Sequence, residues 1–425
     1  MNKTPINLQI GIENMTRCPG SCQGCLMTAE ERKTGRLWSP DVLKCAATWI
    51  KGYLDHWFIN QSQDTIESVS LFLGPGDHLE LVDDEIRQLI DFIVAATDNR
   101  ATAIVTMSAI GKFEIIKRKI DLFYDLSVHY GLSLFPQFVF DPLKSMRNLF
   151  KISYAENITY CRTKFGSVEL TINLGPDVIE KISPKQLHQI LVENDFRQIE
   201  LNILPTNQSD QIFKPIWIKL IDWVIEFYNR WDLDQNYELN FAPVLYEIMQ
   251  LVQGQNLTQQ IRSHIKESLW HNLYIENNGH IFYAQHGVVG NLVPLSSRFN
   301  RLPVGHIEET VDKGLNDYFH KAEPMANKML ARYMRSAHCH HCEFRNTCLM
   351  TGCFSFINLN FIKNEDADCP LMIKPLFAAI ENRQQEMQSY QGLFSRNYAQ
   401  HSSIVERSSG HFLMPPESDA HVKFK

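Results

Sequence analysis

The sequence of 425 residues lacks several features that mark whole classes of protein. No apolar run approaches the length of a membrane span, and the start, MNKTPINLQIGIEN, lacks the long apolar core of a signal peptide. Basic residues are not in excess, because 48 Asp and Glu oppose 41 Lys and Arg. The formal charge of −7 argues against a broad nucleic-acid-binding surface, although it leaves room for a local basic groove. The sequence therefore predicts a cytoplasmic protein that binds neither a membrane nor nucleic acid.

Cysteine is also scarce, with 10 in the chain, but these cysteines are not scattered. Three lie between positions 18 and 25, and five more lie between positions 339 and 369. Only Cys45 and Cys161 stand alone, and we expect both to be small buried apolar residues. In a reducing compartment, clustered cysteines are more often metal ligands or catalytic thiols than disulfides. The two groups are therefore candidate metal sites.

The first 240 residues or so alternate between short apolar strands and amphipathic helices. A helix predicted at 39–57 has Ser39 as its N-cap and Pro40 at its first position. The predicted strands are 7–13, 67–73, 101–109, 167–174, 198–207 and 237–244. Six alternations imply parallel strands joined by helices.

Six units are too few to close an eight-stranded barrel. The sequence therefore predicts an α/β fold with a partial (β/α)6 TIM-like barrel, and a doubly wound open sheet is the alternative. In either architecture, ligands gather at the carboxyl ends of the strands. The three-cysteine loop and the turn GPGD at 74–77 both follow predicted strands at that edge.

The pattern changes near residue 271, and we expect three parts. The barrel domain covers 1–250, a smaller domain at 251–375 carries the second group of cysteines, and 376–425 forms a C-terminal helix and a mobile tail. Within the second part, LYIENNGHIFYAQ predicts a hairpin that turns at Asn277–Asn278–Gly279. The segment that follows, LPVGHIEETVDKGLNDYFHKA, leads into a helix.

The first group has the spacing C-x3-C-x2-C, which chance would produce roughly 0.005 times in a chain of this composition. It consists of Cys18, Cys22 and Cys25. Three thiolates can each ligate one iron of a cubane [4Fe–4S] cluster, and the missing fourth ligand leaves one iron open to a reactant. Gly20 and Gly24 allow the loop to fold tightly around such a cluster. A zinc site with a distant fourth ligand is the alternative.

A loop of this spacing, after the first strand of a six-fold βα chain, resembles that of the radical S-adenosylmethionine (SAM) enzymes. The resemblance implies that SAM chelates the open iron and that an electron from the reduced cluster releases a 5′-deoxyadenosyl radical, which abstracts hydrogen from the substrate. It also implies an electron donor such as flavodoxin or ferredoxin. The cofactors supply this chemistry, while the protein orients them and excludes water and oxygen.

Further residues match the family pattern at the strand ends. After the second predicted strand the family carries a Gly-Gly-Glu-like turn whose backbone receives the SAM ammonium, and this chain has Gly74, Pro75, Gly76 and Asp77 there. By the same resemblance, ribose and adenine contacts are expected from the ends of the fourth and fifth predicted strands, at Thr171, Asn173, Leu204 and Pro205. One departure is Gly24, where the family commonly has an aromatic residue near the adenine.

The second group reads C-x2-C-x5-C-x4-C followed by a later cysteine, and it resembles the SPASM or twitch auxiliary-cluster domain of such enzymes. The match implies one auxiliary [4Fe–4S] cluster held by Cys339, Cys342, Cys348 and Cys369. A second auxiliary cluster lacks its ligands, since Ala284 stands after Gly279 where the family has cysteine, and Cys353 is left without co-ligands. Structural zinc is the alternative. The neighbouring histidines are expected in the second shell or on the surface: His338, His340 and His341.

The resemblance implies an enzyme that modifies a peptide or protein side chain and, by family analogy, one that matures a ribosomally made peptide. About six residues precede the first strand, so recognition of a leader peptide would need a separate protein or the C-terminal region. A sulfatase-maturase-like enzyme is the enzymatic alternative, weakened by the missing cluster ligands. A non-catalytic iron–sulfur or zinc redox protein is the alternative from another class.

Overall fold

A computed structural model describes most of the first 233 residues and part of the remainder. The described residues are 6–20, 27–60, 66–140, 142–143, 153–196, 199–202, 217–233, 266–267, 269–286, 292–294, 303–334, 341–345, 374 and 378. The strands are β1 (Ile6–Met15), β2 (Ile66–Pro75), β3 (Thr102–Met107), β4 (Leu134–Val139), β5 (Glu169–Asn173), β6 (Ile199–Asn202), β7 (Asn272–Ile275), β8 (His280–His286), β9 (Leu292–Pro294) and β10 (Gly305–His306). The helices are α1 (Ala29–Thr34), α2 (Pro40–Asn60), the short 3-10 helix η2 (His78–Glu80), α3 (Asp83–Thr97), α4 (Phe113–Tyr130), α6 (Ser153–Phe165), α7 (Pro176–Lys181), α8 (Pro184–Glu193), α10 (Trp217–Leu233) and α13 (Val311–Met334).

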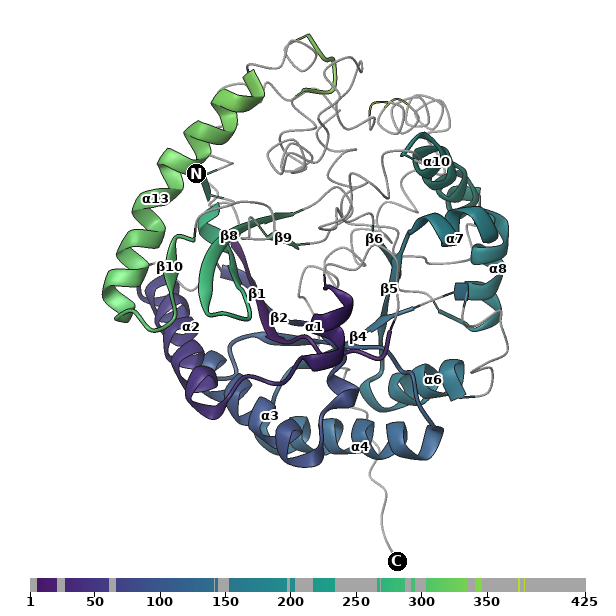
Figure 1. The fold of residues 1–425 in the computed structure, drawn as a ribbon, viewed down its shortest axis with the longest axis horizontal. Helices are drawn as coiled ribbons and strands as arrows, with labels where there is room; N and C mark the ends of the chain where they lie inside the picture. Colours follow the sequence, from purple (N-terminus) through teal and green to yellow (C-terminus); the bar gives the residue numbers. More distant parts are fainter. Residues whose placement is uncertain are drawn as a thin grey trace, which may run out of the picture.

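The described strands form one sheet in the order β10-β8-β7-β1-β2-β3-β4-β5-β6, with β9 on β8. Strands β1 to β6 pair in parallel in sequence order, and helices surround them (Figure 1). Within the described residues β6 ends the sheet instead of pairing with β1, so the barrel is partial. On the other side, β7 pairs in parallel with β1 and turns into the antiparallel β8. The hairpin predicted at Asn277–Gly279 is confirmed, and part of the 251–375 segment thus extends the barrel sheet; the domain boundaries themselves stay a prediction.

Alternating side chains of the strands separate an apolar core from a polar face. Leu8, Ile10 and Ile12 of β1 are buried and belong to one core that also contains residues of β2, β3, α2 and α3. The alternate positions carry Asn7, Gln9, Gly11 and Glu13. Because successive side chains of a strand point to opposite faces of a sheet, these polar residues lie on the face away from the helices. The helices therefore cover an apolar face, and the inner face of the partial barrel is polar along β1.

The order of strands after β3 differs from the sequence prediction. Residues 167–174 were predicted as the fourth strand. They do contain a strand, but its number was wrong, because β4 precedes it and lies between β3 and β5. The reason is Pro136, since proline is normally excluded from central strands. The structure accommodates it because pairing with β5 begins only at Gln137. Thr171 and Asn173 therefore lie on the fifth strand, and the predicted fifth strand is β6.

Two other predicted elements cannot be compared with the structure. The strand predicted at 237–244 lies outside the described residues. The C-terminal helix and tail predicted at 376–425 also lie outside them, apart from Ala378. Among the residues that the structure does describe, no helix is long and apolar enough to cross a membrane.

Helix α13 packs closely on α2, and two glycines allow this approach. A Cβ atom on Gly52 would lie 2.3 Å from Cγ1 of Val311, and one on Gly314 would lie 2.7 Å from Nε1 of the buried Trp49. Aromatic rings fill the rest of the contact, with Tyr53 and Tyr318 edge to face at 5.9 Å between centroids. The segment that leads toward the second group of cysteines is thereby fixed to the barrel.

We predict that Gly52→Ala destabilises the protein, although Gly→Ala inside a helix normally stabilises it by up to about 1 kcal/mol. The clash with Val311 should outweigh that gain and lower the free energy of unfolding by roughly 1–2 kcal/mol in urea titrations. The double variant Gly52→Ala/Val311→Ala should recover most of the loss. A single variant as stable as the wild type would show that the two helices separate freely.

Candidate functional site

The three-cysteine loop starts directly after β1 and folds back on itself through α1. The backbone N–H of Cys18 donates to the carbonyl of Arg32 at 3.1 Å. Thr28 caps α1, with Thr28 and Glu31 each accepting the other's backbone N–H. The Cys18 side chain is half-buried, and its Sγ accepts the backbone N–H of Gly20 at 3.3 Å. Cys22 and Cys25 lie outside the described residues.

The GPGD turn lies against the beginning of this loop. The N–H of Gly76 donates to the carbonyl of Met15 at 3.0 Å, and that of Asp77 donates to the carbonyl of Arg17 at 2.8 Å. A Cβ atom on Gly76 would lie 2.7 Å from the Met15 oxygen and 2.9 Å from the Arg17 oxygen. Because both of these are backbone atoms, only glycine allows this approach. The structure therefore brings together Cys18 and the turn of Gly74, Pro75, Gly76 and Asp77.

The side chain of Asp77 fastens the turn to the end of β3. It is 1% exposed, and Oδ1 accepts backbone N–H groups from Leu79 at 3.1 Å and Ser108 at 3.0 Å, while Oδ2 accepts the Ser108 hydroxyl. Burial raises the pKa of Asp77 to about 6, and the hydrogen bonds from Ser108 and Leu79 oppose that shift. Ser108 and Leu79 therefore hold this carboxyl group in place.

His78 joins the ends of β1 and β3. Its ring is fully buried, Nε2 accepts from the Asn14 side-chain amide at 3.1 Å, and Nδ1 lies 2.9 Å from the Thr106 carbonyl. These partners assign the proton to Nδ1. Burial lowers the pKa of His78 to about 4, so the ring is neutral near pH 7. The register between β1 and β2 shifts between Glu13 and Met15, and this irregularity contains Asn14.

Sequence reasoning missed His78, Asn14 and Ser108. The available signal was a pair of ionisable residues, Asp77-His78, directly after a strand and before a helix. Arg17 was also missed; its guanidinium donates to the Glu80 carbonyl at 2.9 Å and pairs with Glu85 at 3.0 Å. The hydrogen bonds of His78, Asn14, Ser108 and Arg17 connect the carboxyl ends of β1, β2 and β3 next to the cysteine loop.

The residues predicted to contact ribose and adenine are only partly described. Thr171 is 6% exposed on β5, and Asn173 ends that strand opposite Asn202 of β6. Both lie on the same sheet as the GPGD turn, with β3 and β4 between β2 and β5. Leu204 and Pro205 follow β6 and lie outside the described residues.

The second group of cysteines is represented by Cys342 alone. It is half-buried against the main core, next to Phe344, which is 4% exposed. Its carbonyl accepts the Arg345 N–H at 3.2 Å. The other cysteines of the group lie outside the described residues: Cys339, Cys348, Cys353 and Cys369.

The described part of the chain shows no group of three or more His, Cys, Asp or Glu residues placed to hold a metal ion. Of the lone cysteines, Cys161 is fully buried as predicted, and burial raises the pKa of its thiol. Cys45 is half-buried against the core. His341, from the histidine run, is exposed.

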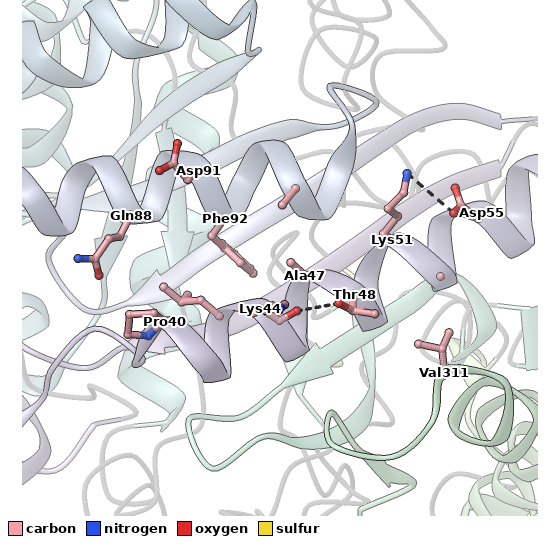
Figure 2. A pocket seen from close by; sticks show the side chains of 13 residues that line it. Pro40, Lys44, Ala47, Thr48, Lys51, Asp55, Gln88, Asp91, Phe92 and Val311 are labelled. Carbon is pink, nitrogen blue, oxygen red and sulfur yellow. Dashed lines mark hydrogen bonds and ion pairs between the residues drawn. The ribbon is translucent and has the colours of Figure 1, made fainter.

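A groove of about 570 Å³ lies elsewhere, between α2, α3 and the start of α13 (Figure 2). Its lining is mostly apolar, including Phe92 and Val311, and Lys44, Lys51 and Asp55 stand along it. No residue that the sequence predicted for a site lines this groove. The candidate site is therefore the strand-end region around Cys18, and not this groove in the helical layer.

Comparison with known proteins supports the fold. Neither the protein-family models nor the curated proteins gave a match. Among solved structures, native anSMEcpe with bound AdoMet aligns at a TM-score of 0.52 and 11% identity, over 94% of this chain and 100% of that one. Native anSMEcpe with bound AdoMet and the Cp18Cys peptide aligns at 0.53 and 12% identity, over 94% and 99%. At this identity the likeness concerns the fold, and the predicted α/β fold with a partial barrel is confirmed.

The buried pair Asp77 and His78 gives a pH prediction. The pKa of Asp77 rises from 3.8 to about 6 on folding, so its contribution makes stability fall as pH rises through that window. The pKa of His78 falls from 6.5 to about 4, so its contribution makes stability rise with pH. In Asp77→Asn only the second contribution is left. When the pH falls from 6.5 to 5, this variant should lose roughly 1 kcal/mol more of its free energy of unfolding than the wild type, as measured by urea unfolding.

The matched control for this experiment is Asp91→Asn, which changes an exposed carboxylate on α3. It should keep the pH dependence of the wild type. If the free energy of unfolding depended on pH equally in Asp77→Asn and the wild type, the opposing contributions of the two buried side chains would be contradicted.

Proposed function

We propose that the protein is a radical SAM enzyme that modifies a peptide or protein. The observation that carries the proposal is the docking of the GPGD turn on the C-x3-C-x2-C loop at the carboxyl end of β1. Two motifs whose positions were predicted from the sequence are joined there by two backbone hydrogen bonds and a glycine contact. Both belong to a parallel strand pair of a partial barrel, the architecture in which ligands gather at this edge.

The residues at this edge fit a cluster and SAM. Cys18 presents a half-buried sulfur that accepts the backbone N–H of Gly20. Cys18, Cys22 and Cys25 would hold the [4Fe–4S] cluster. The backbone of Gly74, Pro75, Gly76 and Asp77 would receive the SAM ammonium, and Thr171, Asn173, Leu204 and Pro205 would contact ribose and adenine. When bound, SAM and the reduced cluster supply a 5′-deoxyadenosyl radical, which abstracts hydrogen from the substrate.

One auxiliary [4Fe–4S] cluster is part of the proposal. Its ligands would be Cys339, Cys342, Cys348 and Cys369. The support is that Cys342 packs against the barrel core beside the buried Phe344, so the segment reaches the body that carries the first cysteine loop. Cys353 has no role in this assignment.

The substrate in this proposal is a peptide or protein side chain, with a ribosomally made peptide as the favoured class. Support comes from the fold shared with anSMEcpe, which has been solved with a bound peptide. A leader peptide would be bound by a separate protein or by the C-terminal region, and an electron donor such as flavodoxin or ferredoxin would supply the electron. The reducing cytoplasm suits both the clusters and these donors.

The direct test is the release of 5′-deoxyadenosine by protein reconstituted without oxygen and supplied with dithionite and SAM. We predict release by the wild type and none by Cys22→Ala, because two thiolates cannot hold the cluster with one iron open to SAM. Liquid chromatography of the reaction measures the product. Cys353→Ala should keep the wild-type iron content and the release.

The absence of 5′-deoxyadenosine from wild-type protein that carries its iron would remove the enzyme from this class. In that case the redox-protein alternative would be favoured. Zinc bound in place of iron after anaerobic purification would have the same consequence.

A further inference from the structure

The base of the cysteine loop is closed by Trp38, two residues before the start of α2. Its backbone N–H donates to the carbonyl of Asn14 at 3.0 Å, so both ends of the segment 15–37 meet at one place. The indole Nε1 of the same residue donates to the carbonyl of Asn277 at 3.0 Å. Asn277 lies in the turn between β7 and β8, more than two hundred residues further along the chain.

A buried carboxyl group makes the second contact between this turn and the loop. Glu13 of β1 is fully buried, its Oε1 accepts the hydroxyl of Tyr274 at 2.9 Å, and its Oε2 accepts the backbone N–H of Asn277 at 3.4 Å. Burial of a carboxyl group is costly unless donors surround it. Loss of the Tyr274 hydroxyl would leave a buried oxygen of Glu13 without its donor. We therefore expect the backbone at Glu13, five residues before Cys18, to shift.

The far side of the same turn is held by β10. The ring of His306 donates from Nε2 to the carbonyl of Asn278 at 2.9 Å, and the N–H of Ile307 donates to the carbonyl of Gly279 at 3.0 Å. Gly279 has a φ of +81°, and a Cβ atom there would lie 2.9 Å from the His306 ring. The turn is thus fixed on one side to the segment that continues into α13 and on the other to the base of the cysteine loop.

We propose that Tyr274 and Asn277 are positioning residues for the cysteine loop, acting through Glu13 and Trp38. The inference deepens the proposed function and rests on it, because the loop is the proposed seat of the cluster and of SAM. Contacts of the β7–β8 hairpin with Glu13 and Trp38 hold the two ends of the loop together, so that Cys18 keeps a fixed position beside the GPGD turn. SAM affinity then depends on the hydrogen bond between Tyr274 and Glu13.

Tyr274→Phe removes one hydroxyl and nothing else, and Tyr283→Phe is its matched control. Tyr283 lies on β8 of the same hairpin, is 1% exposed and donates its hydroxyl to the carbonyl of Tyr318 on the side of α13. Both variants lose one buried hydrogen bond. Only Tyr274→Phe loses one to the base of the cysteine loop.

The first measurement is amide hydrogen exchange of the metal-free protein, read by mass spectrometry over 6–20 and 27–38. We expect Tyr274→Phe to exchange faster than the wild type in both segments, and Tyr283→Phe to match the wild type there. The second measurement is SAM titration of the reduced, reconstituted protein followed by electron paramagnetic resonance. There we expect Tyr274→Phe to bind SAM roughly threefold to tenfold more weakly than Tyr283→Phe.

Substitution of Glu13 keeps the test decisive if Tyr274→Phe folds poorly. Glu13→Gln keeps both contacts when its carbonyl accepts the Asn277 N–H and its amide donates to the Tyr274 oxygen, so it should stay close to the wild type in both measurements. Glu13→Ala should reproduce the loss. The inference would be overturned if Tyr274→Phe changed neither the amide exchange of these segments nor the SAM affinity. It would also be overturned if Tyr283→Phe changed both as much as Tyr274→Phe does. A wild type that fails to bind SAM, with the exchange contrast intact, would instead refute the proposed function and leave the positioning of the loop standing.

Discussion

Two backbone hydrogen bonds, from Gly76 to Met15 and from Asp77 to Arg17, determine how the candidate site is built. They exist because β1 and β2 are parallel neighbours whose carboxyl ends reach the same edge of the sheet. The absence of a side chain at Gly76 lets the turn approach two carbonyl groups of the loop directly. Main-chain hydrogen bonds on Met15 and Arg17 consequently fix the segment that leads into Cys18.

Buried polar side chains reinforce this contact from two sides. On one side Asp77 and His78 fasten the turn to β3 and to Asn14, and on the other side Glu13 connects β1 to the β7–β8 hairpin. Such groups are costly to bury unless they are hydrogen-bonded, and once they are, they favour one arrangement over others. The carboxyl edge of the barrel therefore has a specific geometry, while the apolar core between sheet and helices supplies the stability.

Short-range sequence patterns predicted the features that depend on neighbouring residues. The spacing of Cys18, Cys22 and Cys25, the glycine turn and the alternating strands are all short-range signals, and the fold they predicted is confirmed. Strand β4 was missed because Pro136 violates the usual rule for central strands, although its pairing with β5 starts one residue later. The hairpin was visible in its Asn-Asn-Gly turn, but its parallel pairing with β1 was not.

Contacts between distant residues carry no such signal. Glu13 and Tyr274 are 261 residues apart, and His78 meets Asn14 across 64 residues, so neither pair follows from periodicity or motif. Polar residues at strand ends are common in any barrel, which is why Asn14 and Ser108 did not stand out. The sequence predicted a site at this edge, but the buried groups that hold the loop and the turn together became evident only in the fold.

The central claim is that the N-terminal cysteines hold a cubane with one iron left for SAM. Mössbauer spectroscopy of protein reconstituted anaerobically with isotopically enriched iron tests it most directly. The account predicts that adding SAM changes the signal of a single iron and leaves the other iron sites as they were. A spectrum that is indifferent to SAM, or cysteines occupied by zinc, would contradict it.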